Sequence, residues 1–379
     1  MAKGIKLFKL LGIQISLDYT WFIVLVLFSW SLAYGYFPMK NPGFGTGTYL
    51  AMGIISALLL FACVLAHELS HSYTANRLGM DIHEITLFIF GGVARLTKEP
   101  EDGATELKIA IAGPIASLVL AALFYGASRA IDPETYPLLK SVLSYLAFIN
   151  FMLLAFNMIP GFPLDGGRVF RAIWWMKTGD IDRATKIAST IGKGFAVFLI
   201  AMGLIQIFMG NFVGGLWFVF IGVFVQQAAE GGYQQVVIKK ALEGLKVKDL
   251  MSKPVITIKS SMSLADAVEE FFFKFHHAAF PVMTDGRLTG LLTLTNVRGV
   301  KKDDWPTTPV GEAAHKLDLE DTMSPEDNAM DALAKMMSGQ ADNLGKFPVV
   351  ASGELVGIIS RRDILHLLEF KGGLKKPST

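Results

Sequence analysis

Residues 49–73 read YLAMGIISALLLFACVLAHELSHSY, a long hydrophobic segment with a polar cluster near its end. A helix needs about 20 mostly apolar residues to cross the roughly 30 Å hydrocarbon core of a bilayer. We therefore predict a transmembrane helix here. Its last part contains His67–Glu68–Leu69–Ser70–His71, an H-E-x-x-H pattern. Residues four apart share one face of a helix, so His67 and His71 can bind one Zn²⁺, with Glu68 beside them to activate a water.

The membrane setting strengthens the metal interpretation. An acidic residue at the centre of a bilayer costs about 2.5–3.5 kcal/mol, and a bound metal ion would compensate a cluster of two histidines and a glutamate. The alternative is a pair of interfacial histidines that happen to follow the helix. Cys63 lies one turn before His67. It could bind zinc, but we expect a small buried helix residue.

The composition of the whole chain also indicates a membrane protein. The 379 residues are 52% hydrophobic and 18% charged, with a mean hydropathy of +0.45. Soluble globular domains carry about 25% charged residues, and disordered chains are far less hydrophobic. The net charge of +2 gives no argument for a nucleic-acid partner. The single cysteine excludes an intrachain disulfide.

Long apolar runs end near residue 229, and we expect a membrane domain over residues 1–230. The first run is too long and too aromatic for a signal peptide, so we expect it to be retained. The shorter segment Ile82–Leu96 predicts a β-hairpin or a re-entrant piece near the cytoplasmic interface, and Ile5–Leu17 predicts a strand on the membrane surface. The six predicted transmembrane helices are Tyr19–Phe37, Tyr49–Tyr73, Ile109–Ala130, Leu139–Ile159, Ile187–Met209 and Phe212–Ala228.

Lysine and arginine residues are distributed unevenly between the loops. They concentrate in the N-terminal arm and in the connections after the second and fourth predicted helices. Cytoplasmic loops carry an excess of these residues. We therefore expect a multi-pass protein of the cell (inner, cytoplasmic) membrane, with both termini in the cytoplasm and an even number of crossings.

A catalytic zinc ion needs a third protein ligand, and Asp165 is the best candidate. It follows Pro160 and Pro163, which end regular helix, so the aspartate sits on irregular backbone. With the N-terminus inside, both motifs fall at the cytoplasmic ends of their helices. The alternative for Asp165 is a simple loop turn. Asn157 could stabilise an oxyanion or hold the substrate backbone, or it could bond to a neighbouring helix.

The chain after residue 245 looks like two copies of one unit. Each copy has a helical stretch, a strand, a turn and a second strand, the last being Gly290–Thr293 in the first copy and Gly357–Ser360 in the second. Such a repeat indicates a pseudo-twofold soluble module. We expect a linker over residues 231–245 and repeat units over residues 246–302 and 303–371.

The H-E-x-x-H helix together with Asn157, Pro160 and Leu164–Asp165–Gly166 resembles the site-2 protease family of intramembrane zinc metalloproteases. The resemblance covers about residues 5–229. It implies one zinc ion per chain held by His67, His71 and Asp165, with Glu68 as the catalytic acid and base. It also implies that the substrates are transmembrane segments, with the Gly91–Gly92 region presenting an extended substrate by edge-strand pairing.

The C-terminal repeat resembles a tandem pair of cystathionine-β-synthase (CBS) domains. In that family a hydroxyl residue and an aspartate three positions later commonly bind the ribose of an adenine nucleotide. The second copy keeps Ser360 and Asp363, whereas the first has Thr293 and Asn296, which puts a first site in doubt. The resemblance implies regulation by ATP, ADP or AMP and a homodimer formed through the CBS pair. The alternative is a module that only dimerises or stiffens the enzyme.

These observations together predict a polytopic α-helical membrane protein with small membrane-associated β elements and a C-terminal α/β CBS pair. We expect a protease that cuts transmembrane substrates and is regulated by this pair. One competing hypothesis is a CBS-gated transporter or channel, which should have ionisable residues at the midplane of several helices. Another is an inactive scaffold, against which the intact Glu68 argues. We expect His276 and His277 to be packing or surface residues.

Overall fold

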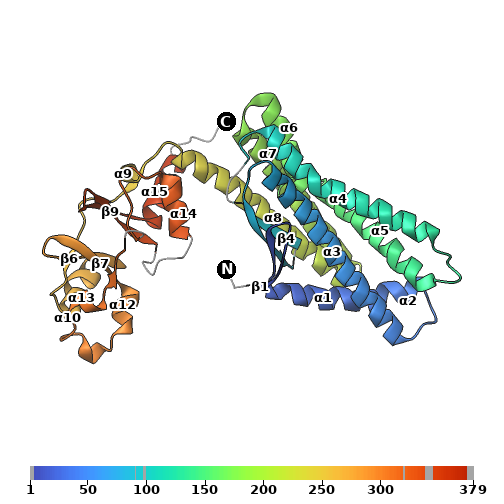
Figure 1. Cartoon of the computed structure of the whole chain (residues 1–379), viewed down its shortest axis with the longest axis horizontal. Helices are drawn as coiled ribbons and strands as arrows, with labels where there is room; N and C mark the ends of the chain where they lie inside the picture. Colours follow the sequence, from blue (N-terminus) through green and yellow to red (C-terminus); the bar gives the residue numbers. More distant parts are fainter. Residues whose placement is uncertain (1–3, 90, 97–99, 319–320, 338–344, 374–379) are drawn as a thin grey trace. The chain divides into compact units, whose positions relative to one another are not determined.

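The computed structural model describes residues 4–89, 91–96, 100–318, 321–337 and 345–373. The chain divides into two compact units, Met1–Val236 and Val237–Thr379. The first contains long helices beside a small sheet, and the second contains shorter helices and strands (Figure 1).

Six helices in the described part of the chain are long and apolar enough to cross a membrane, which confirms the predicted number. The first is continuous from Tyr19 to Lys40 but changes its winding on the way, and the short helix α6 lies between the fourth and fifth spans. The elements are α1 (Tyr19–Ser31), the π-helical η1 (Leu32–Tyr36), α2 (Phe37–Lys40), α3 (Thr46–Arg77), α4 (Gly103–Ala130), α5 (Pro137–Asn157), α6 (Asp165–Thr178), α7 (Ile181–Phe208) and α8 (Phe212–Leu242).

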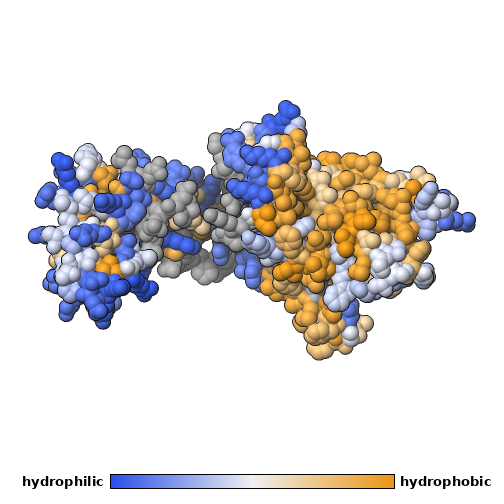
Figure 2. Space-filling view, turned by 60° about the horizontal axis from the view of Figure 1, so that its bottom comes forward, coloured by the Kyte–Doolittle hydropathy of each residue, from blue (hydrophilic) through white to orange (hydrophobic). Residues whose placement is uncertain are grey.

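Several helices extend beyond their predicted ends. Helix α4 begins six residues before the predicted Ile109, because the Asp102 carboxylate caps it by accepting from the backbone N–H groups of Ala104 and Thr105. Helix α8 continues through residues 231–242, which lie in the expected linker. The face drawn in Figure 2 is largely hydrophobic on the first unit and mostly hydrophilic on the second, as the composition of the two parts predicts.

The first unit also carries a four-stranded sheet in the order β1-β2-β3-β4. The prediction of a single strand over Ile5–Leu17 is wrong, because this segment forms a hairpin of two strands. Leu11 and Gly12 take positive φ angles of 51° and 83° and reverse the chain between the strands. Ile82–Leu96 forms the predicted hairpin, with β4 at the sheet edge. The strands are β1 (Ile5–Leu10), β2 (Ile13–Leu17), β3 (Ile82–Phe88) and β4 (Gly91–Leu96).

The second unit contains two related halves with separate hydrophobic cores. In each half a short parallel contact precedes an antiparallel hairpin: β5 pairs with β6 in the first half, and Met323 bridges Val349 in the second. The elements are α9 (Val247–Leu250), β5 (Ile258–Lys259), α10 (Leu264–Ala267), η2 (Val268–Phe272), α11 (Phe273–Phe275), β6 (Ala279–Thr284), β7 (Arg287–Thr293), α12 (Leu294–Gly299), η3 (Lys302–Asp304), α13 (Val310–Ala313), β8 (His315–Lys316), α14 (Ala329–Met337), β9 (Lys346–Ala351), β10 (Glu354–Ser360) and α15 (Arg361–Gly373).

Candidate active site

Helix α3 places its two histidines one turn apart on the same face. Both side chains are buried, His67 being 3% and His71 7% exposed. Their Nε2 atoms are 3.2 Å apart. The helical spacing predicted from the sequence therefore produces two ring nitrogens that point at one position.

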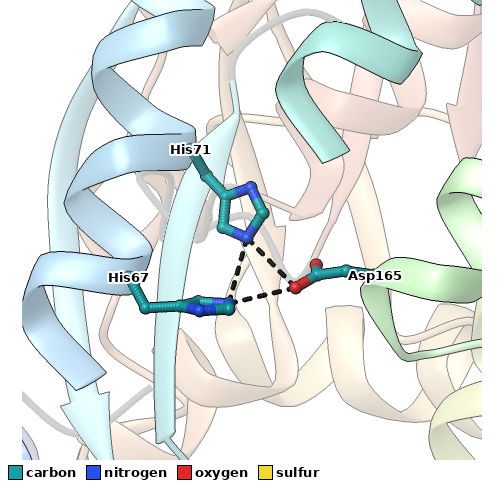
Figure 3. Close-up of side chains that lie close together, drawn as sticks. All are labelled: His67, His71 and Asp165. Carbon is teal, nitrogen blue, oxygen red and sulfur yellow. Dashed lines mark hydrogen bonds and ion pairs between the residues drawn. The ribbon is translucent and has the colours of Figure 1, made fainter. Parts of the chain in front are cut away.

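Asp165 completes this group from the start of α6 (Figure 3). Its Oδ2 atom lies 3.0 Å from His67 Nε2 and 3.2 Å from His71 Nε2. Burial raises the pKa of the Asp165 carboxyl, but the contacts with His67 and His71 outweigh burial and hold that pKa below its usual value. The direction of this shift favours the ionised carboxylate, which is the form that binds a metal ion.

Two glycines after Asp165 fix the loop that carries it. A Cβ atom at Gly166 would lie 2.4 Å from the backbone of Met158, and one at Gly167 would lie 2.4 Å from the backbone of Gly161. Only residues without a side chain allow α6 to start so close to the end of α5. This close packing explains why glycines follow the aspartate.

Helix α4 supports the two histidines without itself contributing a ligand. The Nδ1 atom of His71 lies 2.7 Å from the Ile109 carbonyl oxygen, to which it donates, and His67 Nδ1 lies 2.8 Å from Ser117 Oγ. The Ile109 contact gives His71 the tautomer whose Nε2 carries a lone pair, and the Ser117 contact holds the His67 ring so that its Nε2 faces Asp165. Gly113 lies between the two supporting residues, and a Cβ atom there would come within 2.2 Å of His71 Nε2.

The geometry of the three residues fits a zinc ion. With Zn–N and Zn–O distances of about 2.0–2.1 Å, tetrahedral ligands lie roughly 3.3 Å apart. The three observed separations, 3.0, 3.2 and 3.2 Å, are within a few tenths of that value. No other group of three His, Cys, Asp or Glu residues in the described ranges offers ligand atoms this close together. Two imidazoles, one carboxylate and an open fourth position are the donor set of a catalytic zinc site.

Glu68 lies beside this centre and against strand β4. The residue is partly buried, and its carboxylate interacts electrostatically with His67, Asp165 and Arg168. A Cβ atom at Gly92 of β4 would lie 2.4 Å from Glu68 Cγ, so any larger residue there would displace the Glu68 side chain. The edge strand of the sheet therefore passes directly over the candidate general base.

Asn157 is the last residue of α5 and is partly exposed. Within the described residues its side-chain amide makes no hydrogen bond. Cys63 is buried and does not belong to the metal group, in agreement with its interpretation as a packing residue.

The candidate nucleotide residues form helix caps in the second unit. Thr293 has no exposed surface, and its hydroxyl and backbone N–H donate to Asn296 Oδ1 at 2.6 and 3.0 Å. Ser360 makes the same contacts with Asp363 Oδ2, at 2.6 and 2.8 Å. The other Asp363 oxygen accepts from the Ser252 hydroxyl. His277, predicted as a packing or surface residue, stacks on Phe280 with a ring separation of 5.6 Å.

Comparison with known families identifies the two units. The sequence profile of peptidase family M50 matches residues 55–132 and 133–202, the region that contains His67, His71 and Asp165. Zinc metalloprotease MJ0392 of Methanocaldococcus jannaschii is 33% identical over 380 residues, which cover 99% of this chain and 100% of the relative. The chain belongs to peptidase family M50.

Two further proteins resemble this M50 protease over most of its length or over its membrane unit. Rip3 of Mycobacterium tuberculosis is 33% identical over 371 residues, covering 97% of the chain and 94% of Rip3. The solved site-2 protease of Methanocaldococcus jannaschii is 35% identical, with a TM-score of 0.44, over 61% of the chain and 95% of that structure.

The CBS domain profile matches residues 247–303 and 321–369, so the expected CBS pair is confirmed. The protein is thus a multi-pass membrane zinc metalloprotease of the site-2 protease type with two C-terminal CBS domains. This membership favours the protease hypothesis over a CBS-gated transporter.

Proposed function

We propose that the protease hydrolyses peptide bonds within or next to transmembrane segments, with His67, His71 and Asp165 as its zinc ligands. The observation that carries this proposal is the convergence of three ligand atoms, 3.0–3.2 Å apart, from the candidate membrane span α3 and from the start of α6. A soluble peptide would not need a site built on a spanning helix. A transmembrane segment can approach α3 laterally through the bilayer.

Each side chain of the site has a distinct role in this proposal. A bound zinc ion supplies Lewis-acid activation of water and of the scissile carbonyl. Glu68 accepts the proton of the attacking water and passes it to the leaving amine. The free amide of Asn157 donates a hydrogen bond to the carbonyl oxygen as negative charge develops there.

The edge strand β4 supplies a way to hold the substrate. A transmembrane helix hides its carbonyls in internal hydrogen bonds, so it has to unwind before it can be cut. Among the described strands β4 is at the edge of the sheet, with one side unpaired, and it passes over Glu68 at Gly92. An unwound segment can add to this edge by backbone pairing, which presents an extended peptide bond to the site.

We also propose an orientation. Positively charged residues favour cytoplasmic termini in a cell membrane, with the active site near the cytoplasmic side. Water then reaches the site from the cytoplasm, because His67 and His71 lie in the second half of α3 and Asp165 lies after the end of α5. Cysteine labelling from either side of the membrane, with the cysteine introduced at residue 132 or residue 303, tests this orientation.

For regulation, we propose that an adenine nucleotide binds the second CBS domain. Ser360 and Asp363 would hold the ribose, and Lys346 and Arg362, which interact electrostatically with each other, would face the phosphates. Burial holds the pKa of Lys346 below its usual value, and a bound phosphate would reverse this shift. We keep the expected domain boundaries, with the linker at 231–245. We also expect a homodimer formed through the CBS pair, and sedimentation of the solubilised protein can test this oligomeric state.

Co-expression with a panel of single-pass membrane proteins tests the catalytic part. The parent should cut at least one substrate, whereas Asp165→Asn should lose both cleavage and near-stoichiometric zinc. The matched control is Asp303→Asn, at an exposed aspartate of the CBS unit. If purified parent protein contains no zinc, or if Asp165→Asn retains it fully, the ligand assignment is wrong.

A further inference from the structure

A buried ion cluster joins two helices next to the metal group. Glu106 lies in the first turn of α4 and has no exposed surface. An ionised carboxylate is held in such a place only when cations or hydrogen-bond donors compensate for its lost hydration. Two arginines of α6, Arg168 and Arg171, provide the compensation.

Arg171 makes the closer contacts. Its Nε atom donates to the two Glu106 oxygens at 2.9 and 3.1 Å, and its Nη2 atom also contacts Oε1. Arg168 Nε lies 3.9 Å from the same oxygen. The carbon of the Arg171 guanidinium also lies 4.9 Å from the centre of the Phe162 ring, in the loop that leads to Asp165. One guanidinium therefore joins the start of α4 to both α6 and the loop before it.

The same face of α4 also holds the histidines. Ile109, whose carbonyl oxygen accepts from His71, lies one turn after Glu106, and Gly113 and Ser117 follow at helical spacing. The first turns of α4 thus make two contacts: Ile109 contacts His71, and Glu106 contacts α6, the helix that begins with Asp165. If α6 shifted along α4, the distance between Asp165 Oδ2 and His71 Nε2 would change.

We propose that Glu106 is a positioning residue for the zinc site. Through its fork-shaped pairing with Arg171, it fixes the start of α6 so that Asp165 stays at bonding distance from the metal. This inference rests on the proposed role of Asp165 as a ligand. It assigns a metal-organising function to a residue that touches neither metal nor substrate. Outer partners of this kind change metal affinity by about 10–100-fold when they are removed.

The test uses the full-length protein in detergent and two variants of the cluster. Arg171→Lys keeps the positive charge but loses the planar fork. The double variant Glu106→Gln/Arg171→Met removes the pair without leaving a lone carboxylate. The matched control is Glu230→Gln, which breaks the exposed Lys193–Glu230 ion pair, 3.0 Å long, elsewhere in the same unit. Asp165→Asn is the reference for a missing ligand.

Two measurements besides proteolysis report on the metal site. We expect competition with a chelator to give a zinc Kd about 10–100-fold higher for both cluster variants and unchanged for Glu230→Gln. We expect the visible absorption of the Co²⁺-loaded variants to move from the parent spectrum toward that of Asp165→Asn. Thermal unfolding of the metal-free proteins measures any purely structural effect of the same substitutions.

The outcomes separate this inference from the function on which it rests. If Asp165→Asn changes the zinc Kd and the Co²⁺ spectrum but both cluster variants match the parent, Glu106 does not position the ligand. A lower melting temperature of the metal-free variants, with metal binding intact, would likewise contradict the positioning role and leave the cluster merely structural. If Asp165→Asn itself changes neither quantity, the ligand assignment fails first.

Discussion

The metal group of the membrane unit and the helix caps of the CBS unit both consist of polar side chains held close together, but they differ in one respect. At the caps the partners satisfy each other: the hydroxyl and backbone N–H of Ser360 both donate to Asp363. At the metal group, three atoms with lone pairs face a common point. All three can offer a lone pair to one cation at that point, which the atoms of a cap cannot do.

This difference separates a structural role from a functional one. A cap needs no ligand to form, because it pairs with the backbone donors that every helix leaves unpaired at its start, so its function has to be tested separately. A convergent set of acceptors is explained only by a cation or by a proton held between its members. The outward contacts of His67 and His71 with Ser117 and Ile109 support this interpretation, because they fix which nitrogens face inward.

The largest effect is expected from Glu68→Gln, which removes the general base while keeping the shape of the side chain. Cleavage should fall by about 10²–10⁴-fold, because the amide cannot accept the proton of the attacking water. Zinc content should stay at the parent level, since Glu68 is not part of the convergent group. Cleavage of a co-expressed substrate and metal analysis of the purified protein measure the two effects.

The control for this variant is Glu134→Gln, at an exposed glutamate between α4 and α5. It should cut like the parent. Parent-like cleavage by Glu68→Gln would show that the metal group does not operate with this base, and the proposed mechanism would have to be abandoned.

A second test fills the space at the convergent point. In Gly113→Ala the new methyl group would come within 2.2 Å of His71 Nε2 and 2.6 Å of His67 Nε2. We expect zinc to bind at least about 10-fold more weakly, because the rings must turn away from their common point. Gly126→Ala, in the same helix, is the matched control: its methyl group meets nothing within 4 Å, and alanine favours the helix.

Zinc affinity of both glycine variants can be measured by competition with a chelator. A Gly113→Ala protein with parent affinity would mean that the metal, if bound, lies elsewhere. Weakened binding in both variants would indicate a general response of α4 to substitution instead.

A smaller effect is expected from Ser117→Ala, which removes the contact partner of His67 Nδ1 but leaves every ligand in place. The loss of an outer partner should weaken zinc binding by about 10-fold, at the low end of the range for such residues. Ser128→Ala is the control, because the Ser128 hydroxyl donates within its own helix, to the Tyr125 carbonyl. Equal zinc affinities for the two serine variants would contradict a supporting role for Ser117.

The sequence was sufficient to predict the features that are determined by residues close together in the chain. The spacing of His67 and His71 determines that they share a helix face, and the prolines before Asp165 place it on a turn. The number of membrane spans follows from hydropathy alone. These features depend on neighbours within a few positions of the chain, so one sequence contains the signal.

The supporting residues of α4 were missed because their roles depend on contacts between helices. Nothing in the local sequence of Glu106, Ile109 or Ser117 says which helix they face. Gly113–Pro114, inside an apolar span, was the available signal, because a glycine there invites close approach of another group. The hairpin at Leu11–Gly12 was missed for another reason: a leucine with positive φ is uncommon, and the Leu-Gly pair is a weak turn signal.

The smallest effect tests the CBS side of the comparison, with Thr293→Ala and Ser360→Ala as a matched pair. Each removes the hydroxyl of a helix cap with the same bonding pattern, so each should lower the free energy of unfolding by about 1 kcal/mol. Only Ser360→Ala should also weaken binding of ATP or AMP, because only the second copy has the aspartate. Thermal unfolding and calorimetric titration of the full-length protein measure the two quantities. If both variants bind nucleotide as tightly as the parent protein, the Ser360–Asp363 pair serves only as a helix cap. The two CBS domains would then have the same structural role at this position, and neither would resemble the metal group.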